Sequence, residues 1–211
     1  MKEKFEKFTR VFWIFVLGCI IGFIFETILV LFQKGYIESR QGLIYGPFSP
    51  VYGIGGIIYY LFFKNVKTRN KWAVFFIAMF LGGTTEFICS LLQEEIFGSI
   101  SWDYSYMPFN LNGRTSLLHC TYWGIAGLLY ITCIEPFILK IEKHLDKKWM
   151  KIITIILTTF MIFNIIISAA ALIRQKNRIH NVPPRNGIEV FLDEHYPDEF
   201  MNKIYANKRN K

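Results

Sequence analysis

The sequence has few acidic residues and no motif for nucleotide hydrolysis. Its 211 residues include 24 Lys and Arg but only 16 Asp and Glu. It contains no GxxxxGK[ST] phosphate loop, no GxSxG and no HExxH. The chain is therefore not expected to hydrolyse nucleotide itself, and active transport would draw its energy from a partner or from an ion gradient.

Cysteine is also scarce. Cys19, Cys89, Cys120 and Cys133 all lie within apolar runs, and none shows CxxC spacing. This placement favours buried free thiols over a disulfide or a metal site. Local metal-ligand spacing such as HxxxH is missing too. We therefore expect no metal, no cofactor and no assigned catalytic residue.

What the sequence has in abundance is hydrophobic residues, 53% of the chain, gathered into blocks. Runs of this length can cross a hydrocarbon core of about 30 Å as helices, at about 1.5 Å per residue. The four long runs are Val11–Phe32, Trp72–Leu92, Leu117–Leu139 and Ile152–Ile173. A fifth, Val51–Phe63, reaches spanning length if the chain from Gly42 is included, so five spans are predicted. A basic N-terminus leads straight into the first run, which we expect to be a retained helix rather than a signal peptide.

The net charge of +8 is distributed as in a membrane protein. Basic residues gather before the first run, between the second and third (Lys64, Lys67, Arg69, Lys71), and at 140–151. The alternate loops hold few bases, so the positive-inside rule predicts a multi-pass protein of the cell membrane with a cytoplasmic N-terminus. Five spans then place the C-terminus outside. This pattern argues against a nucleic-acid partner and for the lipid bilayer.

Two glutamates stand in the same local frame inside apolar runs. Gly22-x3-Glu26-x6-Gln33 in the first run matches Gly82-x3-Glu86-x6-Gln93 in the third. A carboxylate within a membrane segment costs several kcal/mol and by default marks function. The repeated frame predicts a duplicated unit that builds one polar site from both copies.

The duplication continues after the glutamates. Gly42-x10-Gly53 in the first copy matches Gly113-x10-Gly124 in the second. Glu86 lies 60 residues after Glu26, whereas Gly124 lies 71 after Gly53, so the second copy carries an 11-residue insertion. Each copy is predicted to be a helical hairpin, and both enter the membrane in the same direction as a parallel repeat.

We therefore predict an all-α polytopic membrane protein with five transmembrane helices, two parallel helical-hairpin repeats plus a fifth helix. A transmembrane domain spans 1–175, with repeat one at about 11–63, repeat two at about 72–139 and the fifth helix at 152–173. Residues 176–211 form a polar C-terminal tail with a short amphipathic helix.

The predicted site is an outward-facing polar cavity around the two glutamates. Aromatic and proline-rich loops, 45–50 and 104–110, lie on the same side and are expected to dip into the membrane and cap it, because non-helical backbone at that depth must be buried or line water. The candidate substrate-binding residues are Glu26, Glu86, Gln33, Gln93, Arg114, His119, Tyr45, Tyr52, Trp123 and Asp103.

Several roles stay open. The glutamates either bind a cation, proton or polar solute, or fasten the loops structurally. His119 is a general base, a ligand or an ordinary hydrogen-bonding residue, and Arg114 pairs with a glutamate or receives an anionic head group. The basic segment 140–151, with Ile141, Leu145 and Trp149 four residues apart, is predicted to be an interfacial helix that contacts anionic lipid or a cytoplasmic partner.

The loop motifs resemble a known family. Tyr45-Gly46-Pro47 followed by Pro50-Val51-Tyr52-Gly53, then Trp102-Asp103-Tyr104-Ser105, Asn112-Gly113-Arg114 and Trp123-Gly124 are similar to the CmpB family, described as "putative ABC-transporter type IV". The resemblance covers most of residues 11–178 and includes uncharacterised eukaryotic transmembrane relatives; Tyr196-Pro197-Asp198-Glu199 in the tail fits it as well. It implies a membrane subunit that works with a cytoplasmic ATPase.

The leading functional prediction is a transporter or permease-like subunit, more plausibly not an enzyme, that binds a small polar or cationic solute through Glu26 and Glu86. Its partners would be an ATPase subunit or a second copy of the chain. The alternatives are an intramembrane enzyme that acts on lipid or an exported substrate with Glu and His119 as acid and base, and a non-catalytic membrane scaffold.

Overall fold

A computed structural model describes residues 2–65, 70–144 and 147–210. Lys67 and Arg69 of the predicted basic loop, and Leu145 of the predicted interfacial helix, lie outside these ranges. The elements in chain order are α1 (Lys2–Lys34), α2 (Pro50–Asn65), α3 (Lys71–Phe97), β1 (Ser99–Ile100), β2 (Asn110–Leu111), β3 (Thr115–Ser116), α4 (Leu117–Leu129), η1 (Tyr130–Ile134), α5 (Glu135–Glu142), α6 (Lys148–Ile179), α7 (Gly187–His195), α8 (Asp198–Ile204) and β4 (Arg209–Asn210).

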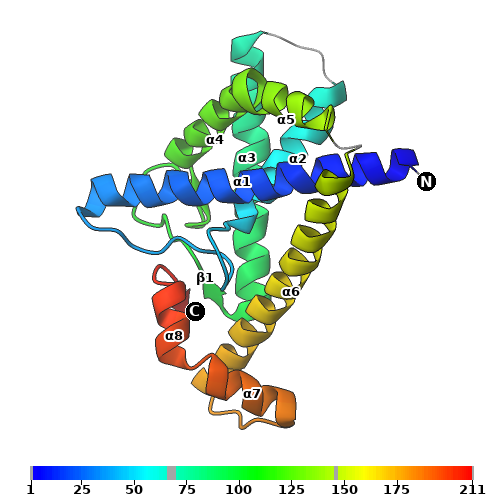
Figure 1. The fold of residues 1–211 in the computed structure, drawn as a ribbon. Helices are drawn as coiled ribbons and strands as arrows, with labels where there is room; N and C mark the ends of the chain where they lie inside the picture. Colours follow the sequence, from blue (N-terminus) through cyan, green and yellow to red (C-terminus); the bar gives the residue numbers. More distant parts are fainter. Residues whose placement is uncertain (1, 66–69, 145–146, 211) are drawn as a thin grey trace.

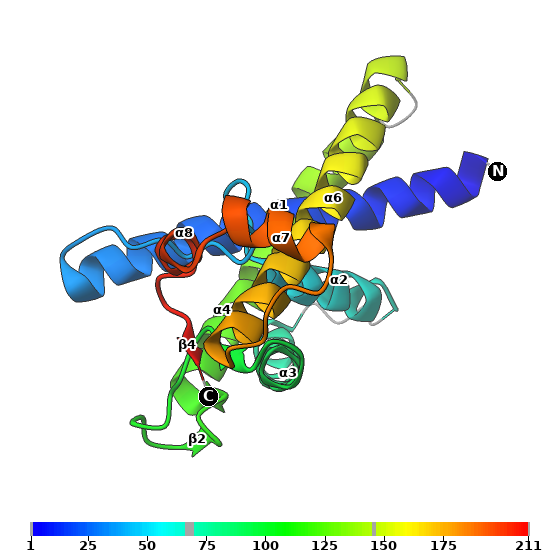
Figure 2. The same cartoon turned by 90° about the horizontal axis from the view of Figure 1, so that it is seen from below.

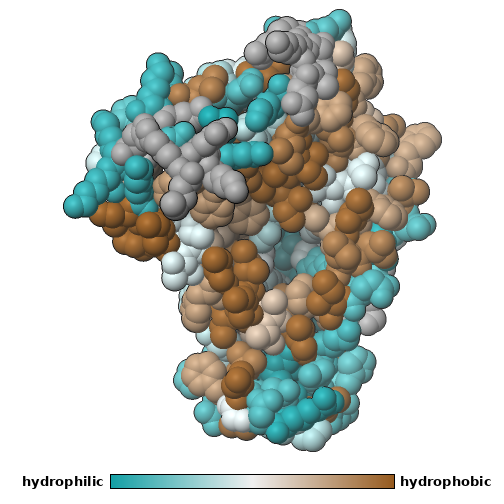
Figure 3. Space-filling model, turned by 90° about the vertical axis from the view of Figure 1, so that its right-hand side faces the viewer, coloured by the Kyte–Doolittle hydropathy of each residue, from teal (hydrophilic) through white to brown (hydrophobic). Residues whose placement is uncertain are grey.

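The predicted all-α membrane architecture is confirmed at this level. Four helical segments are long and apolar enough to cross a membrane: Phe5–Lys34, Lys71–Phe97, Leu117–Ile141 and Lys148–Ile179. In Figure 3 hydrophobic residues dominate the middle of the visible face, and hydrophilic residues gather toward its two ends. The face is hollowed between two apolar ridges, and more hydrophilic atoms lie at the floor of the hollow.

The predicted extension of the second span from Gly42 is not helical. Helix α2 has 16 residues and begins only at Pro50. Gly46 adopts φ +80°, in the left-handed region that favours glycine, and Pro47 follows it. Since proline disfavours a helical conformation in the residue before it, the chain turns here. Helix α2 alone is therefore shorter than a membrane span.

Local sequence explains where the helices of the second hairpin begin and end. The Asn70 side chain accepts hydrogen bonds from the first amides of α3, and Gly98 closes that helix with φ +62°. Ser116 caps α4 in the same way through the amide of His119. Ahead of Pro136, the helix passes through the π-helical turn η1. Glu135-Pro136 thus follows a π-turn in a continuing helix.

Helices pack mainly as two pairs, α1 with α2 and α3 with α4. Glycines at matching positions of the two pairs make the close contacts within each pair. A Cβ atom on Gly22 would lie 2.1 Å from the Tyr52 ring, and one on Gly82 would lie 2.4 Å from Trp123. Gly53 and Gly124 likewise face the rings of Phe15 and Phe75. Figures 1 and 2 show that α1 and α3 cross rather than run side by side, with α6 slanting between their directions.

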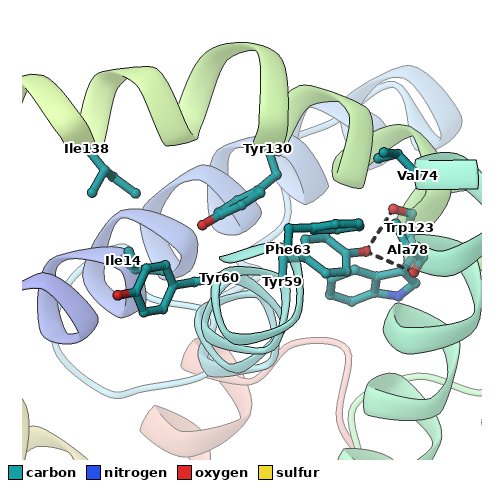
Figure 4. Packing of buried hydrophobic residues seen from close by; sticks show 9 residues of the cluster. All are labelled: Ile14, Tyr59, Tyr60, Phe63, Val74, Ala78, Trp123, Tyr130 and Ile138. Carbon is teal, nitrogen blue, oxygen red and sulfur yellow. Dashed lines mark hydrogen bonds between the residues drawn. The ribbon is translucent and has the colours of Figure 1, made fainter. Parts of the chain in front are cut away.

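The two pairs meet through residues that are 71 apart in the sequence. Tyr52 stacks on Trp123 with ring centroids 5.0 Å apart, and Tyr59 meets Tyr130 edge-on at 5.9 Å. Figure 4 shows Tyr59 at the centre of this core, where its hydroxyl donates to the carbonyls of Trp123 and Ala78. Contact between equivalent residues is what a pseudo-two-fold axis between two related hairpins produces.

The segment between α1 and α2 folds back to the middle of α1. The amide of Ser49 donates to the carbonyl of Cys19, and Leu43 and Phe48 are buried against Val16 and Met161. Asn164 of α6 holds the backbone of Tyr45 from both sides: its Nδ2 donates to the carbonyl at 2.6 Å and its Oδ1 accepts from the amide at 3.1 Å. The amide of Ile44 donates to Ser168. The backbone polar groups of the loop are thus satisfied although it is buried.

The tail forms two short helices that pack on the end of α6. Leu192, Tyr196, Met201 and Tyr205 are buried against Ala171 and Leu172 of α6 and against Ile44. Short strands complete this end of the molecule, with β1 pairing antiparallel to β4 and β2 to β3. In Figure 1 this end carries α7, α8 and the C-terminus, beside β1 and the end of α6.

Candidate functional site

Glu86 of α3 is buried, with 6% of its surface exposed. Its carboxylate accepts hydrogen bonds from the hydroxyls of Tyr104 (3.1 Å) and Thr115 (2.7 Å). The indole N–H of Trp123 is a further donor to it. Burial, together with the nearby carboxylates, raises the pKa of Tyr104 well above its ordinary value. The phenol therefore stays protonated and remains a donor to Glu86.

Glu26 of α1 is half-buried and more sparsely held. The hydroxyl of Tyr52 donates to it at 2.9 Å. Arg40, from the loop after α1, is close enough to act on Glu26 electrostatically. The same guanidinium lies 3.7 Å from Glu38, and its Nε is buried without a hydrogen bond.

The two carboxylates belong to one cluster. Glu26 acts electrostatically on Glu86, and both carboxylates act electrostatically on the hydroxyls of Tyr52 and Tyr104. Tyr52, the donor to Glu26, stacks on Trp123, a donor to Glu86. Each glutamate is thus bound by an aromatic side chain of its own hairpin, and these two side chains occupy equivalent repeat positions.

His119 lies at the edge of this cluster. Its ring stacks on Tyr104 with centroids 3.6 Å apart, and its Nδ1 lies 2.8 Å from the hydroxyl of Ser116. The Tyr104 ring therefore lies between His119 and its own hydrogen bond to Glu86. Cys120, the next residue, lies 3.4 Å from the Thr115 hydroxyl.

Five other predicted site residues lie elsewhere. Gln33 is exposed at the end of α1, and Gln93 exchanges hydrogen bonds with Ser101. Arg114 pairs with Glu94 at 2.6 Å instead of with either intramembrane glutamate. Asp103 accepts hydrogen bonds from Ser105 and faces Arg209, and the Tyr45 hydroxyl meets that of Tyr196 at 2.8 Å. These residues shape the loops that border the site.

Three residues of the cluster are missing from the predicted site residues. Thr115 and Tyr104 come from the loop before α4, and Arg40 from the loop before α2. The signal for Tyr104 was its place in the aromatic loop expected to cap the cavity. Nothing in the local sequence distinguishes Thr115 or Arg40 as neighbours of a glutamate.

The arrangement suits reversible binding of a proton, a cation or a polar solute. Two carboxylates with neutral hydroxyl and indole donors offer acceptor atoms to a cation, and aromatic faces add cation–π attraction. Within residues 2–65, 70–144 and 147–210, no group of three His, Cys, Asp or Glu side chains is arranged to hold a metal ion.

Comparison with known proteins places most of the chain in one family. A family model described as "Putative ABC-transporter type IV" matches residues 13–169. The match covers both hairpins and most of α6, and it ends before Arg174 and the tail. No curated protein and no solved structure matches the chain.

Proposed function

Since the chain belongs to the family described as "Putative ABC-transporter type IV", we propose that it is a transporter or permease-like membrane subunit whose solute site is the Glu26–Glu86 pair. The solute is a small polar or cationic species. The cell membrane holds the chain with its N-terminus in the cytoplasm, and both glutamates face the outer side.

One observation carries this proposal: the carboxylates come from equivalent helices and act on each other electrostatically, although such groups are costly inside a membrane. A purely structural role, with one carboxylate fastening each loop, would not require the two carboxylates to act on each other. The closeness of the pair adds like-charge repulsion, which a bound proton or cation relieves.

Flux through reconstituted vesicles tests the proposal. The probes are protons, reported by an entrapped pH-sensitive dye under an imposed potential, and labelled tetramethylammonium. Glu26→Gln and Glu86→Gln are each expected to lower the flux by about tenfold or more, since removing a charged partner typically costs more than 1.4 kcal/mol. Glu95→Gln, an exposed carboxylate later in α3, is the matched control and should leave flux unchanged. Wild-type flux in both site variants would remove the proposal.

Acid–base chemistry is the second candidate, favoured by the stacked contact of His119 with Tyr104, the donor to Glu86. An enzyme acting on lipid would yield a product whose formation falls in His119→Gln while proton and tetramethylammonium flux stays intact. Lipid analysis of vesicles that carry either the wild-type protein or His119→Gln distinguishes an enzyme from a transporter. Loss of neither activity in any site variant supports a scaffold.

A cytoplasmic ATPase is the partner that the family name suggests, and the end of the molecule around the α5–α6 junction is the surface we propose for it. Exposed Lys140, Lys143, Lys147 and Lys148 gather there beside half-exposed Trp149. The predicted single interfacial helix over 140–151 is replaced by the end of α5 and the start of α6. Reversal of Lys143 and Lys147 to Glu should abolish co-purification of an ATPase, whereas Lys203→Glu in the tail should not.

A further inference from the structure

The C-terminal segment, residues 180–210, touches the loop of the first hairpin. The Tyr45 hydroxyl meets the Tyr196 hydroxyl at 2.8 Å, and Ser39 donates to the carbonyl of Ile204 at 2.8 Å. Ile44 is buried among Leu192, Tyr196 and Met201. This loop leads into Tyr52, the partner of Glu26.

The same segment touches the loop of the second hairpin. Strand β4 pairs with β1 in the register Ser99 to Asn210 and Ile100 to Arg209. The side-chain amide of Asn207 donates to the carbonyl of Ser101 at 2.6 Å, and Arg209 lies 3.3 Å from Asp103. This loop carries Tyr104 and Thr115, the partners of Glu86.

Between these contacts the segment is bound firmly to α6. Buried Arg174 makes two hydrogen bonds of 2.8 Å to Asp193, and Arg178 binds Asp193 and Asp198. Gln175 donates to Asn202 and accepts from Lys208. The tail thus joins α6 to both hairpin loops, and it lies outside the part of the chain that the family model matches.

We propose that residues 180–210 form a strap that holds the two loops closed over the Glu26–Glu86 cluster and must release for a solute to reach it. The direction of each contact supports this. Among the described residues, the hydrogen bonds from the strap to the two hairpins go to their loops, and Phe97 at the end of α3 packs on the same cluster. Release of the strap therefore frees the loop that carries Tyr104 and the loop that leads into Tyr52, while α1 and α3 stay packed. The proposal rests on the proposed function only for what the cluster binds, because access to the cluster can be measured without a solute.

Native cysteines report that access. Cys120 lies beside Thr115, one hydrogen bond from Glu86, and Cys133 is exposed farther along the same helical segment. Purified protein in micelles is treated with a water-soluble methanethiosulfonate, and each labelled peptide is quantified by mass spectrometry. Met201→Asp, at a position with 0% exposure in α8, should undock the strap and speed Cys120 labelling about tenfold or more, because reactivity through an opening tracks the open fraction. Lys203→Asp places the same residue on the exposed side of α8 and should not.

A chain that ends at Ala206 provides a second variant, because it loses the contacts to the second loop and the Lys208 bond to Gln175 while α7 and α8 keep their own contacts with α6. It too should label faster at Cys120, with Cys133 unchanged in every variant. Wild-type Cys120 rates in both strap variants would overturn the strap. Faster Cys120 labelling in the strap variants, together with unaltered flux in Glu86→Gln, would support the strap and contradict the transport role. Wild-type labelling in the strap variants, together with reduced flux in Glu86→Gln, would contradict the strap alone.

Discussion

At the scale of single residues, the two glutamates are equivalent in position and unequal in support. Glu86 is held by three donors and is buried, whereas Glu26 has the Tyr52 hydroxyl and the electrostatic influence of Arg40. Tyr104, which donates to Glu86, lies in the longer of the two loops. Glu86 is therefore the more preorganised carboxylate, and Glu26 is the one better able to change partners.

Removal of the Tyr104 hydroxyl tests how much the loop donor contributes to Glu86. Tyr104→Phe should lower the free energy of unfolding by about 2 kcal/mol, a typical value for a hydrogen bond to a charged group. Tyr106→Phe, two residues later and 75% exposed, is the control and should change little. Denaturant titration in micelles measures both. Equal losses would show that the bond to Glu86 contributes nothing specific.

Asp193 of α7 joins the tail to two arginines of α6. Hydrogen bonds from Arg174, and then Arg178, hold the pKa of its carboxyl below the ordinary value. A lowered folded-state pKa means that its stabilisation is complete above the ordinary pKa of about 3.9 and is lost as the pH falls through the lower folded value. The tail amides should therefore stay protected from hydrogen exchange at pH 5 and lose protection only in stronger acid.

Asp193→Asn should remove this stabilisation at every pH. It removes the closer of two charged partners of Arg174 on α7 and leaves Glu189 at 3.8 Å from this 2% exposed side chain, at a cost of about 3 kcal/mol. Trypsin cleavage of the tail at neutral pH should then rise roughly a hundredfold, since cleavage follows the open population. Glu194→Gln, the exposed neighbour, is the control. Cleavage of Asp193→Asn at the wild-type rate would contradict the assigned pairing.

At the scale of elements, the two hairpins share their packing and differ in how their loops are held. The second loop supplies its own support through β2, β3 and Asp103. The first loop has no insertion and is held by α6, through Asn164 and Ser168. Helix α6 thus gives the first loop the support that the second loop obtains from its own residues.

The glycines that face an aromatic ring, Gly22 and Gly82, are expected to contribute equally to the stability of the two hairpins. Gly22→Ala and Gly82→Ala would each press a Cβ atom against the stem of an aromatic ring, Tyr52 or Trp123. We expect each to lose about 2 kcal/mol of stability, because overpacking outweighs the gain in helix propensity. Gly56→Ala is the control, since its Cβ would lie 3.4 Å from Ile14 and meet only ordinary contact. Thermal unfolding in micelles measures the stability of all three variants. Wild-type stability of both Gly22→Ala and Gly82→Ala would contradict the close contacts at these glycines.

Asn164 and Ser168 bind the backbone of the first loop, and substitutions in α6 should destabilise the protein to graded extents. Asn164→Leu leaves both the amide and the carbonyl of Tyr45 without partners and should cost about 3 kcal/mol. Ser168→Ala removes the acceptor of the Ile44 amide and a longer hydrogen bond to Asn164, and should cost about 1 kcal/mol. Thr159→Val, at an exposed site on the same helix, should be neutral. Hydrogen exchange at residues 44 and 45 reports the loop directly, and a reversed order would rule out these contacts.

Sequence pattern predicts the parts of this molecule that depend on periodic hydrophobicity. The long apolar runs became helices, and the equivalent frames of Glu26 and Glu86 lie in one cluster. Loop contacts are not periodic, so the pattern could not show that Gln93 binds Ser101 or that Arg114 binds Glu94. The polar pair Asn164 and Ser168, four residues apart in an apolar run, was a readable signal for a buried partner. The first loop's return to Cys19, which shortens α2, depends on a contact with α1 that no local pattern contains.

At the scale of the whole molecule, the tail contacts segments that come from three different parts of the chain. Loops from both hairpins and the end of α6 meet at the tail, so the segments that follow α1, α3 and α6 come together there. A chain that crosses the membrane in the same direction in α1 and in α3 has to return between them, although α2 is short. The first loop folds back beside Cys19, and α2 continues from there to a point near Arg10, which donates to Tyr60.

Side-specific labelling tests this arrangement. Single cysteines placed at Ile37, Tyr106 and Ile188, each more than 70% exposed, represent the two loops and the tail. All three should react with a membrane-impermeant maleimide in intact cells, because the tail holds both loops on its own side of the membrane. Lys147→Cys, exposed at the α5–α6 junction, should react only after permeabilisation, since α6 separates it from the tail. Reaction of Ile37→Cys and Tyr106→Cys from opposite sides would mean that α2 does not carry the chain back across, and reaction of Ile188→Cys together with Lys147→Cys would mean that α6 does not span.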